Sequence, residues 1–381
     1  MAEQRLVAVR VVDDEVAGGG EAEAGGVVEA EHLAVGAVEV EGHAGAWHGG
    51  RGAAGPHGPM TRRTDEMRPR RASLLHHPTS RHPEAPVTTT PTREIRSATL
   101  TVPGAELAWD VRPAAPGSMP APPLLLVGSP MAAAGFGTLS GSFPDRTVVT
   151  YDPRGSERSR RTDGATSSTP QEHAGDLAAV IEAAGGGPVD VFASSGGAVN
   201  ALELVVHRPE LVRTLVAHEP PSIPVLPDRA EASAATHAVA DAYARDGFGA
   251  GMAGFIRLVS HRGPVPADLG PMPDPAAFGL PAGDDGSRDD VMLGQNLVAS
   301  SHHEHDVEAL RAAPVRIVLA VGEESAGELA HRGGEGMAAR LGTEPVVFPG
   351  GHAGFLGGEY GQTGEPEAFA ARLREVLDGA A

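Results

Sequence analysis

The sequence predicts an α/β fold built on a doubly wound, mostly parallel β-sheet. Short apolar runs typical of buried strands, such as 124–127, 189–192 and 317–321, alternate along the chain with amphipathic helical stretches. Parallel strands need a crossover between them, so this alternation indicates βαβ units with right-handed connections. The second observation is the stretch 188–202, where a strand, a very tight turn and a helix follow one another directly.

Length and composition limit what this protein does. The chain has 381 residues, 41% of them hydrophobic, which is enough for a sizeable core. Its net charge of −20 argues against nucleic acid and anionic membranes as partners, because both need a basic surface. It has no cysteine, which excludes disulfides and thiolate metal sites. No apolar run reaches the roughly 18–20 residues of a membrane span, and we expect a cytoplasmic protein.

Residues 1–95 differ from the rest of the chain. Low-complexity mixtures of Gly, Ala, Val and Glu are followed by a basic stretch that contains prolines. Such a segment has too little apolar surface to offset the entropy of ordering, so we predict a disordered extension. An alternative is a mis-called start, with the true start at Met60 or Met67. The folded domain is predicted over 96–381.

The first half of this domain is predicted to open with an antiparallel hairpin over 98–109, which turns at a Pro-Gly pair. Buried strands follow at 124–127 and 147–151. A helix is then expected to begin after Thr169, because Pro170 at the first helical position and Glu172 at the third complete a capping box. Three consecutive glycines end this helix before strand 189–192.

The second half begins with a strand at 214–217, after which 222–305 interrupts the alternation. This insertion contains two helix-like stretches, a loop rich in Pro, Gly and Asp and another short helix, and it is predicted to form a helical cap over an active site. Alternation resumes with strand 317–321. The remaining predicted elements are a helix at 326–341, a strand at 346–348 and a last helix with its apolar stripe over 369–377.

The turn 194–197 carries the candidate nucleophile. A serine at the tip of such a turn has a strained backbone, so the residues two positions away on each side must be small. Ser195 has Ala193 and Gly197 in these places. The serine before it would have the large Phe192 as one of these neighbours. Ser195 is therefore the candidate nucleophile.

At this turn the sequence resembles the α/β-hydrolase superfamily, whose corresponding motif usually has the pattern Gly-x-Ser-x-Gly. The resemblance spans roughly 97–381 and implies a Ser/His/acid triad. In the superfamily the base is a histidine after the last strand, where this sequence has His352. The acid follows either the penultimate strand, where Glu324 lies, or the strand after the nucleophile's helix, where Glu219 lies. Glu219 is preferred, because a carboxylate at the end of a buried strand must be paired.

Acyl transfer also needs two N–H groups that face the developing oxyanion. One is predicted to be that of Gly196, the residue after the nucleophile. The other belongs in the loop after 124–127, where the superfamily commonly has His-Gly-x-Pro and this chain has Val-Gly-Ser-Pro. Pro130 has no N–H, so Ser129 is the predicted donor. The segment 152–155, Asp-Pro-Arg-Gly, resembles a turn of structural importance in the superfamily.

Together these motifs predict a serine hydrolase that cleaves a small ester, thioester, lactone or amide without a cofactor or metal. The expected partner is a small-molecule substrate; self-association into a homo-oligomer is left open. A perhydrolase resembling haloperoxidases, or a C–C bond hydrolase, would use the same triad. A non-catalytic ligand-binding protein of this fold is the third interpretation. The segment 302–306, His-His-Glu-His-Asp, matches no zinc-protease spacing and is predicted to be a solvated loop.

Overall fold

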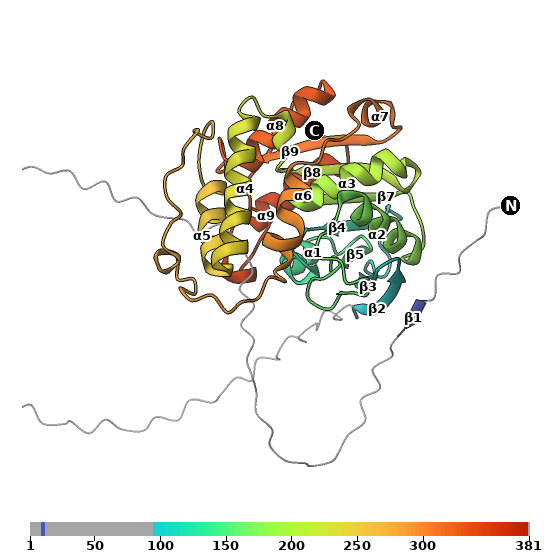
Figure 1. Ribbon diagram of the computed structural model, residues 1–381. Coiled ribbons are helices and arrows are strands. Elements are labelled where there is room, and N and C mark those ends of the chain that lie inside the picture. Colours follow the sequence, from blue (N-terminus) through green and yellow to red (C-terminus); the bar gives the residue numbers. More distant parts are fainter. Residues whose placement is uncertain (1–8, 12–93, 380–381) are drawn as a thin grey trace, which may run out of the picture. The chain divides into compact units, whose positions relative to one another are not determined.

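A mixed β-sheet with helices on both faces organises the described residues, which are 9–11 and 94–379 of the computed structural model (Figure 1). The strands lie in the order β1-β2-β3-β5-β4-β7-β8-β9-β10, with β6 paired to β3. Neighbours from β5 to β10 are parallel, whereas β1, β2 and β3 add an antiparallel edge. The strand bounds are β1 Val9–Val11, β2 Arg96–Val102, β3 Ala105–Arg112, β4 Leu124–Val127, β5 Val148–Tyr151, β6 Arg160–Arg161, β7 Val189–Ser194, β8 Val212–His218, β9 Arg316–Gly322 and β10 Val346–Phe348.

The helices connect these strands and form the insertion between β8 and β9. Their bounds are α1 Gly137–Gly141, α2 Pro170–Ala183, α3 Gly196–His207, α4 Arg229–Asp246, α5 Phe248–Val259, α6 Leu297–Ser301, α7 Val307–Ala312, α8 Leu329–Leu341 and α9 Pro366–Leu377. A π-helix, Val291–Asn296, precedes α6. Within the part of the chain that the structure describes, we find no helix long and apolar enough to cross a membrane.

The parallel strands are buried on both faces, because alternate side chains of each strand enter two different apolar clusters. In β4, Leu125 and Val127 pack in the cluster that contains α2, α3 and α8. Leu124 and Leu126 pack on the other face with α1 and α9. Coverage of both faces explains why these strands are apolar throughout rather than alternating, and it confirms the predicted doubly wound sheet.

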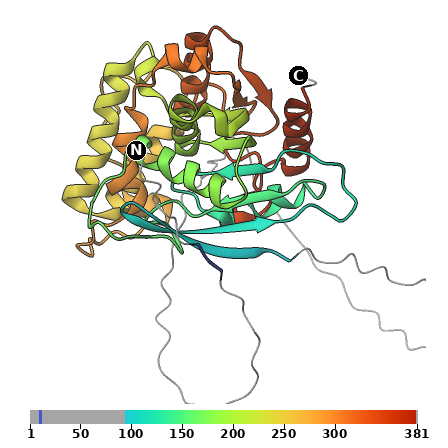
Figure 2. The same ribbon diagram turned by 90° about the vertical axis from the view of Figure 1, so that its right-hand side faces the viewer.

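The insertion has an apolar cluster of its own, drawn from residues between Ile223 and Leu329. Its two longest helices, α4 and α5, pack against each other. Figure 2 shows α4, in yellow, and α9, in dark red, at opposite sides of the described part. The helical character predicted for 222–305 is thus confirmed.

Several predicted boundaries differ from those observed. Strand β7 runs two residues further than 189–192, because Ser194 still pairs with His218 of β8. Helix α8 begins at Leu329 rather than 326, and α7 was not predicted. The predicted disordered extension, 1–95, lies outside the described residues except for 9–11 and 94–95.

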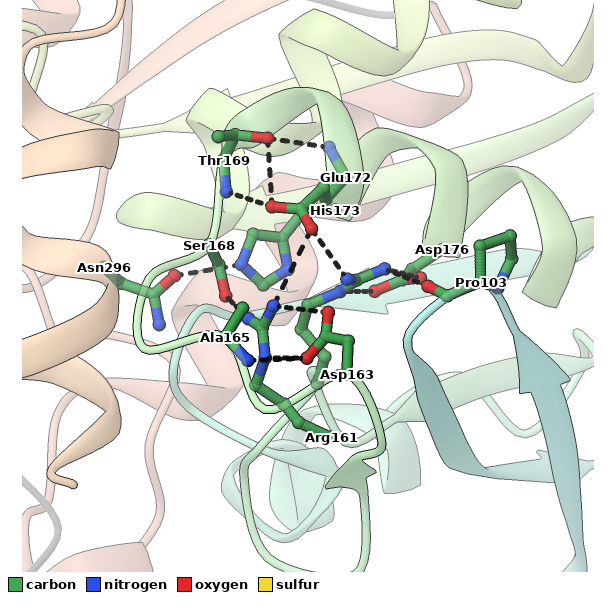
Figure 3. A network of polar contacts seen from close by, with 11 residues as sticks. Pro103, Arg161, Asp163, Ala165, Ser168, Thr169, Glu172, His173, Asp176 and Asn296 are labelled. Atoms are coloured by element: carbon green, nitrogen blue, oxygen red, sulfur yellow. Dashed lines mark hydrogen bonds and ion pairs between the residues drawn. The ribbon is translucent and has the colours of Figure 1, made fainter.

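The start of α2 confirms the predicted capping box. The Thr169 hydroxyl accepts a hydrogen bond of 3.2 Å from the Glu172 N–H, and the Glu172 carboxylate accepts one of 2.8 Å from the Thr169 N–H (Figure 3). One residue further on, the His173 ring contacts the Asn296 side chain at 2.9 Å, so α2 is joined to the π-helix of the insertion.

The turn 152–155 is fixed by a buried ion pair. Arg154 donates two hydrogen bonds of 2.7 Å to the carboxylate of Asp176, which lies on α2, and both side chains are almost fully buried. The bidentate geometry fixes the turn against the helix. This arrangement agrees with a structural importance for the motif.

Candidate active site

The turn between β7 and α3 has Ser195 at its tip. Its φ of 57° and ψ of −130° are a left-handed conformation that is strained for any residue except glycine. Helix α3 begins directly afterwards at Gly196. A Cβ atom on Gly197 would lie 2.6 Å from the carbonyl oxygen of Val127, so the predicted need for a small residue there is real.

The preceding serine is held in a separate contact. The Ser194 hydroxyl lies 3.1 Å from Nδ1 of His218, and both side chains are buried. Burial lowers the pKa of His218 to about 4, so its ring is neutral at physiological pH. Ser195 is more exposed than Ser194. Of the two serines in the turn, Ser195 is thus the one open to a ligand.

The two predicted oxyanion donors lie close together. A Cβ atom on Gly196 would be 2.7 Å from the carbonyl oxygen of Ser129, so the turn after β4 packs directly against the start of α3. The Gly196 N–H belongs to the first turn of α3 and has no acceptor within that helix. Ser300 of α6 reaches the same place, since its Oγ atom lies 3.2 Å from that Cβ position. The insertion therefore contributes a polar atom beside the turn.

Glu219 follows β8 directly and has no exposed surface. Its φ of 49° turns the chain away from the sheet, while its N–H still bonds to the carbonyl oxygen of Ala320 in β9 at 2.9 Å. One carboxylate oxygen, Oε1, accepts hydrogen bonds from the Gly322 N–H, at 2.8 Å, and from the Ser325 hydroxyl. The other, Oε2, lies 2.6 Å from Nδ1 of His352.

His352 lies in the loop after β10, which runs alongside β9. Because a carboxylate only accepts hydrogen bonds, the contact with Glu219 assigns the proton to Nδ1 and leaves Nε2 free to accept one. The His352 side chain is 33% exposed. Ser195 and Glu219 each come one residue after the paired Ser194 and His218, which places them at the same edge of the sheet.

Charge and burial act against each other in this pair. Burial works to lower the pKa of His352, but the hydrogen bond to Glu219 and the charge of that carboxylate outweigh it and raise the pKa. Burial likewise works to raise the pKa of Glu219. The contacts with His331 and His352 overcome this and hold the pKa well below its ordinary value. The carboxylate is therefore ionised at neutral pH.

Sequence reasoning did not identify two residues that contact Glu219. Nδ1 of His331, on α8, lies 3.5 Å from Oε1, and the Ser325 hydroxyl bonds to the same oxygen. Ser325 is 106 residues further along the chain, and no local pattern marks such a partner. The alternative acid, Glu324, is exposed. The geometry thus brings Glu219, and not Glu324, to the histidine.

Two surface cavities lie away from these residues. One, of about 370 Å³, is lined by residues that include Asp110 and Arg158. The other, of about 580 Å³, lies beside Tyr243 and Leu293 in the insertion. Ser195 and His352 line neither of them.

The segment 302–306 is a loop, as predicted, with Glu304 and Asp306 exposed, but the prediction that it is solvated is wrong for two of its histidines. The side chain of His305 has no exposed surface, and that of His303 is only 11% exposed. Both turn toward Glu203, whose carboxylate lies on α3 and is 5% exposed. A buried carboxylate needs polar partners, and this segment supplies them.

No family model matches the sequence. The sequence is 27% identical, over 301 residues, to the uncharacterized hydrolase YraK of Bacillus subtilis (strain 168), a match that covers 74% of this chain and 97% of YraK.

Solved structures share the fold. The carboxylesterase CesB (YbfK) of Bacillus subtilis superposes with a TM-score of 0.52 at 15% identity, over 75% of this chain and 92% of CesB. A putative aryl esterase of Burkholderia cenocepacia has a TM-score of 0.51 at 20% identity, over 75% and 99% of the two chains. MGS-M2, an α/β-hydrolase from a Medee basin deep-sea metagenome library, has a TM-score of 0.51 at 14% identity, over 72% and 94%. The chain therefore has the fold of α/β-hydrolases.

Proposed function

We propose that this protein is a serine hydrolase that cleaves a small carboxylic ester, or a related thioester, lactone or amide, through an acyl-enzyme. The observation that carries the proposal is the 2.6 Å contact between Glu219 and His352 at the edge of the sheet where Ser195 has its strained backbone. Among the candidate bonds we favour the ester. The names of the relatives, a hydrolase, a carboxylesterase and an aryl esterase, support this choice.

In the first step the Ser195 hydroxyl adds to the substrate carbonyl carbon while Nε2 of His352 takes its proton. Nδ1 of His352 already donates to Glu219, so the imidazolium formed in this step has an ionised carboxylate beside it. Because Glu219 is buried and ionised, the attraction is stronger than it would be in water.

The carbonyl oxygen becomes an oxyanion as the new bond forms. N–H groups of Gly196 and Ser129 are the proposed donors to it, which agrees with the close approach of their backbones. The tetrahedral intermediate then expels the leaving group, which takes the proton from His352. Water attacks the acyl-enzyme in the same way, with His352 as base, and Ser195 regains its proton when the acid leaves.

The helical insertion is the proposed cap over this site. Ser300 of α6 supports this, since its hydroxyl reaches the start of α3 from the insertion. Its Oγ atom is buried and has no hydrogen-bond partner within the described residues, so it is available to a polar atom of a substrate. We propose that the substrate is a small molecule enclosed between α6 and the turn that carries Ser195.

The test is labelling with a fluorophosphonate, which reacts only with an activated serine, together with hydrolysis of short-chain aryl esters. Ser195→Ala should abolish both labelling and turnover, because the other serine of the turn, Ser194, is buried against His218. Ser194→Ala is the matched control, since that hydroxyl is committed to His218. The control variant should still be labelled.

Two outcomes would overturn the proposal. One is labelling that persists in a folded Ser195→Ala variant, which would place the reactive serine elsewhere. The other is a folded wild-type protein that is neither labelled nor active on any ester, which would favour a ligand-binding role for the same fold.

A further inference from the structure

A cluster of histidine and carboxylate side chains lies two turns along α3 from the candidate active site. Glu203, on α3, directs Oε2 toward the loop between α6 and α7. Nε2 of His303 lies 2.8 Å from this oxygen, and Nδ1 of His305 lies 3.4 Å from it. The three ligand-type atoms lie within 4.8 Å of one another. The proposed hydrolase mechanism uses none of these residues.

The contact of His305 with Glu203, at 3.4 Å, leaves the ring without a hydrogen bond. Its side chain has no exposed surface, and neither ring nitrogen makes a hydrogen bond to any residue in the described ranges. A buried imidazole without a hydrogen bond is unfavourable, because its two nitrogens lose water and gain only the 3.4 Å contact with Glu203. Since the ring faces Glu203 and stands nearly perpendicular to His303, at 84°, one nitrogen of each ring can face the same point.

The second oxygen of Glu203 is held from the other side. Nε2 of His207, one turn further on α3, and the side-chain amide of Gln171 contact Oε1 at 2.8 and 3.0 Å. These contacts fix the carboxylate with Oε2 pointing toward His303 and His305. Metal-binding carboxylates are commonly oriented in this way by hydrogen bonds to the oxygen that does not bind.

We propose that Glu203, His303 and His305 form a binding site for one divalent transition-metal ion, with Zn²⁺ as the best match. Two imidazole nitrogens and one carboxylate oxygen are a common zinc ligand set, and such a set leaves a fourth position for water. At metal–ligand distances of about 2.0–2.1 Å, tetrahedral ligand atoms lie roughly 3.3 Å apart. The contacts of 2.8 and 3.4 Å to Oε2 are close to this spacing, and the two histidine nitrogens, which lie within 4.8 Å of each other, reach it by side-chain rotation.

The ion would join two parts of the fold. Helix α3 belongs to the core and starts at the nucleophile turn, whereas His303 and His305 follow α6 at the end of the insertion. A bound ion would therefore fasten the insertion to the core near Ser300. We expect the ion to stabilise the protein without taking part in the reaction at Ser195. Ser195 precedes α3 and lies eight residues before Glu203, or about 12 Å along the helix axis.

The experiment uses the full chain without an affinity tag, stripped with a chelator and then titrated with Zn²⁺ by calorimetry. One ion should bind per chain. At zinc 100-fold above Kd, the melting temperature should rise by about 5 °C or more. His303→Gln and His305→Asn should each weaken zinc binding by about 100-fold and remove the thermal shift. His302→Gln is the matched control, because that neighbouring ring contacts Ser233 and is not among the ligands.

His303→Gln is expected to fold, because glutamine at this position can still donate a hydrogen bond to Glu203. The test therefore does not depend on a misfolded variant. The proposal is overturned if folded wild-type protein binds zinc no more tightly than His303→Gln does. It is also overturned if zinc binds at one equivalent but leaves the melting temperature unchanged in wild type and variants alike. Loss of ester hydrolysis does not enter these readouts, so the proposed function is tested separately.

Discussion

Glu219 is a charged residue with no exposed surface, and its contacts explain why it is tolerated there. Two N–H or O–H donors satisfy one oxygen, and His352 satisfies the other. The sequence could predict that this carboxylate is paired, because it ends a buried strand. It could not predict Ser325 or His331, since their approach depends on how α8 and the loop before it pack.

The pH dependence of activity follows from the pair of Glu219 and His352. His352 must be neutral to accept a proton, and its pKa is raised above 6.5 by Glu219. We expect kcat/KM to fall as the pH decreases through a value above 6.5. Glu219→Gln should move this limb to lower pH and reduce kcat by roughly 10³–10⁴-fold, since the amide no longer stabilises the imidazolium. Steady-state kinetics between pH 5 and 9 measure both effects.

Glu324→Gln is the control for this prediction, because the Glu324 side chain is exposed. It should change kcat by less than about twofold and leave the acidic limb of the pH profile of kcat/KM unshifted. If Glu324→Gln instead lowers kcat and shifts the acidic limb of the pH profile, Glu324 is the acid of the triad.

Helices and strands were predictable where a local signal is strong. Strands β4 and β10 have the predicted bounds, and the capping box at Thr169 marks the start of α2 correctly. Helix α7 was not predicted because it has only six residues, although Asp306 caps it through a 2.9 Å bond to the Ala309 N–H. The further short helix predicted near the end of the insertion is a π-helix, Val291–Asn296, capped by Asp290 through a 2.7 Å bond to the Leu293 N–H. The burial of His305 depends on a partner on α3.

Glycines inside two helices should respond in opposite ways to alanine. A Cβ atom on Gly333 of α8 would lie 2.2 Å from the carbonyl oxygen of Pro220, the residue after Glu219. Gly333→Ala should therefore destabilise the protein by about 1–3 kcal/mol and reduce activity, because the backbone beside Glu219 must move. Gly175 of α2 has nothing within 4 Å of its Cβ position. Gly175→Ala should stabilise by about 0.5–1 kcal/mol through helix propensity.

Urea unfolding measures this contrast as opposite changes in the midpoint at constant slope. If Gly333→Ala is as stable as wild type, the packing of α8 against the segment after β8 is not as described. If both alanines stabilise, helix propensity alone decides the outcome.

Over the whole molecule, polar contacts connect apolar clusters that would otherwise be independent. The insertion has its own cluster and is joined to α2 through His173 and Asn296 (Figure 3). An ion pair between Arg332 and Asp228 connects α8 to the start of α4. The sequence indicated the sheet and the insertion, because each has its own apolar pattern. The contacts between the sheet and the insertion join residues that are distant in sequence, so they could not be predicted without the structure.

Acid sensitivity is expected from these buried connections. Burial lowers the pKa of His173 to about 4 and that of His218 to about 4, whereas both titrate near 6.5 in the unfolded chain. Between these values the unfolded state binds protons that the folded state does not, so stability decreases as the pH falls. Each group contributes a loss of about 3 kcal/mol between pH 6.5 and 4. The raised pKa values of His331 and His352 act mainly above pH 6.5, where their stabilising effect is lost as the pH rises.

His173→Gln isolates one of these contributions, because glutamine can still donate to Asn296 but does not titrate. The free energy of unfolding, measured with urea between pH 6.5 and 4.5 in the presence of a chelator, should fall less steeply in this variant. The expected difference in slope is about 1.4 kcal/mol per pH unit. His237→Gln, at an exposed position of α4, should leave the slope unchanged. Equal slopes in wild type and His173→Gln would mean that His173 is already protonated in the folded state, and that its contact with Asn296 persists as a charged one.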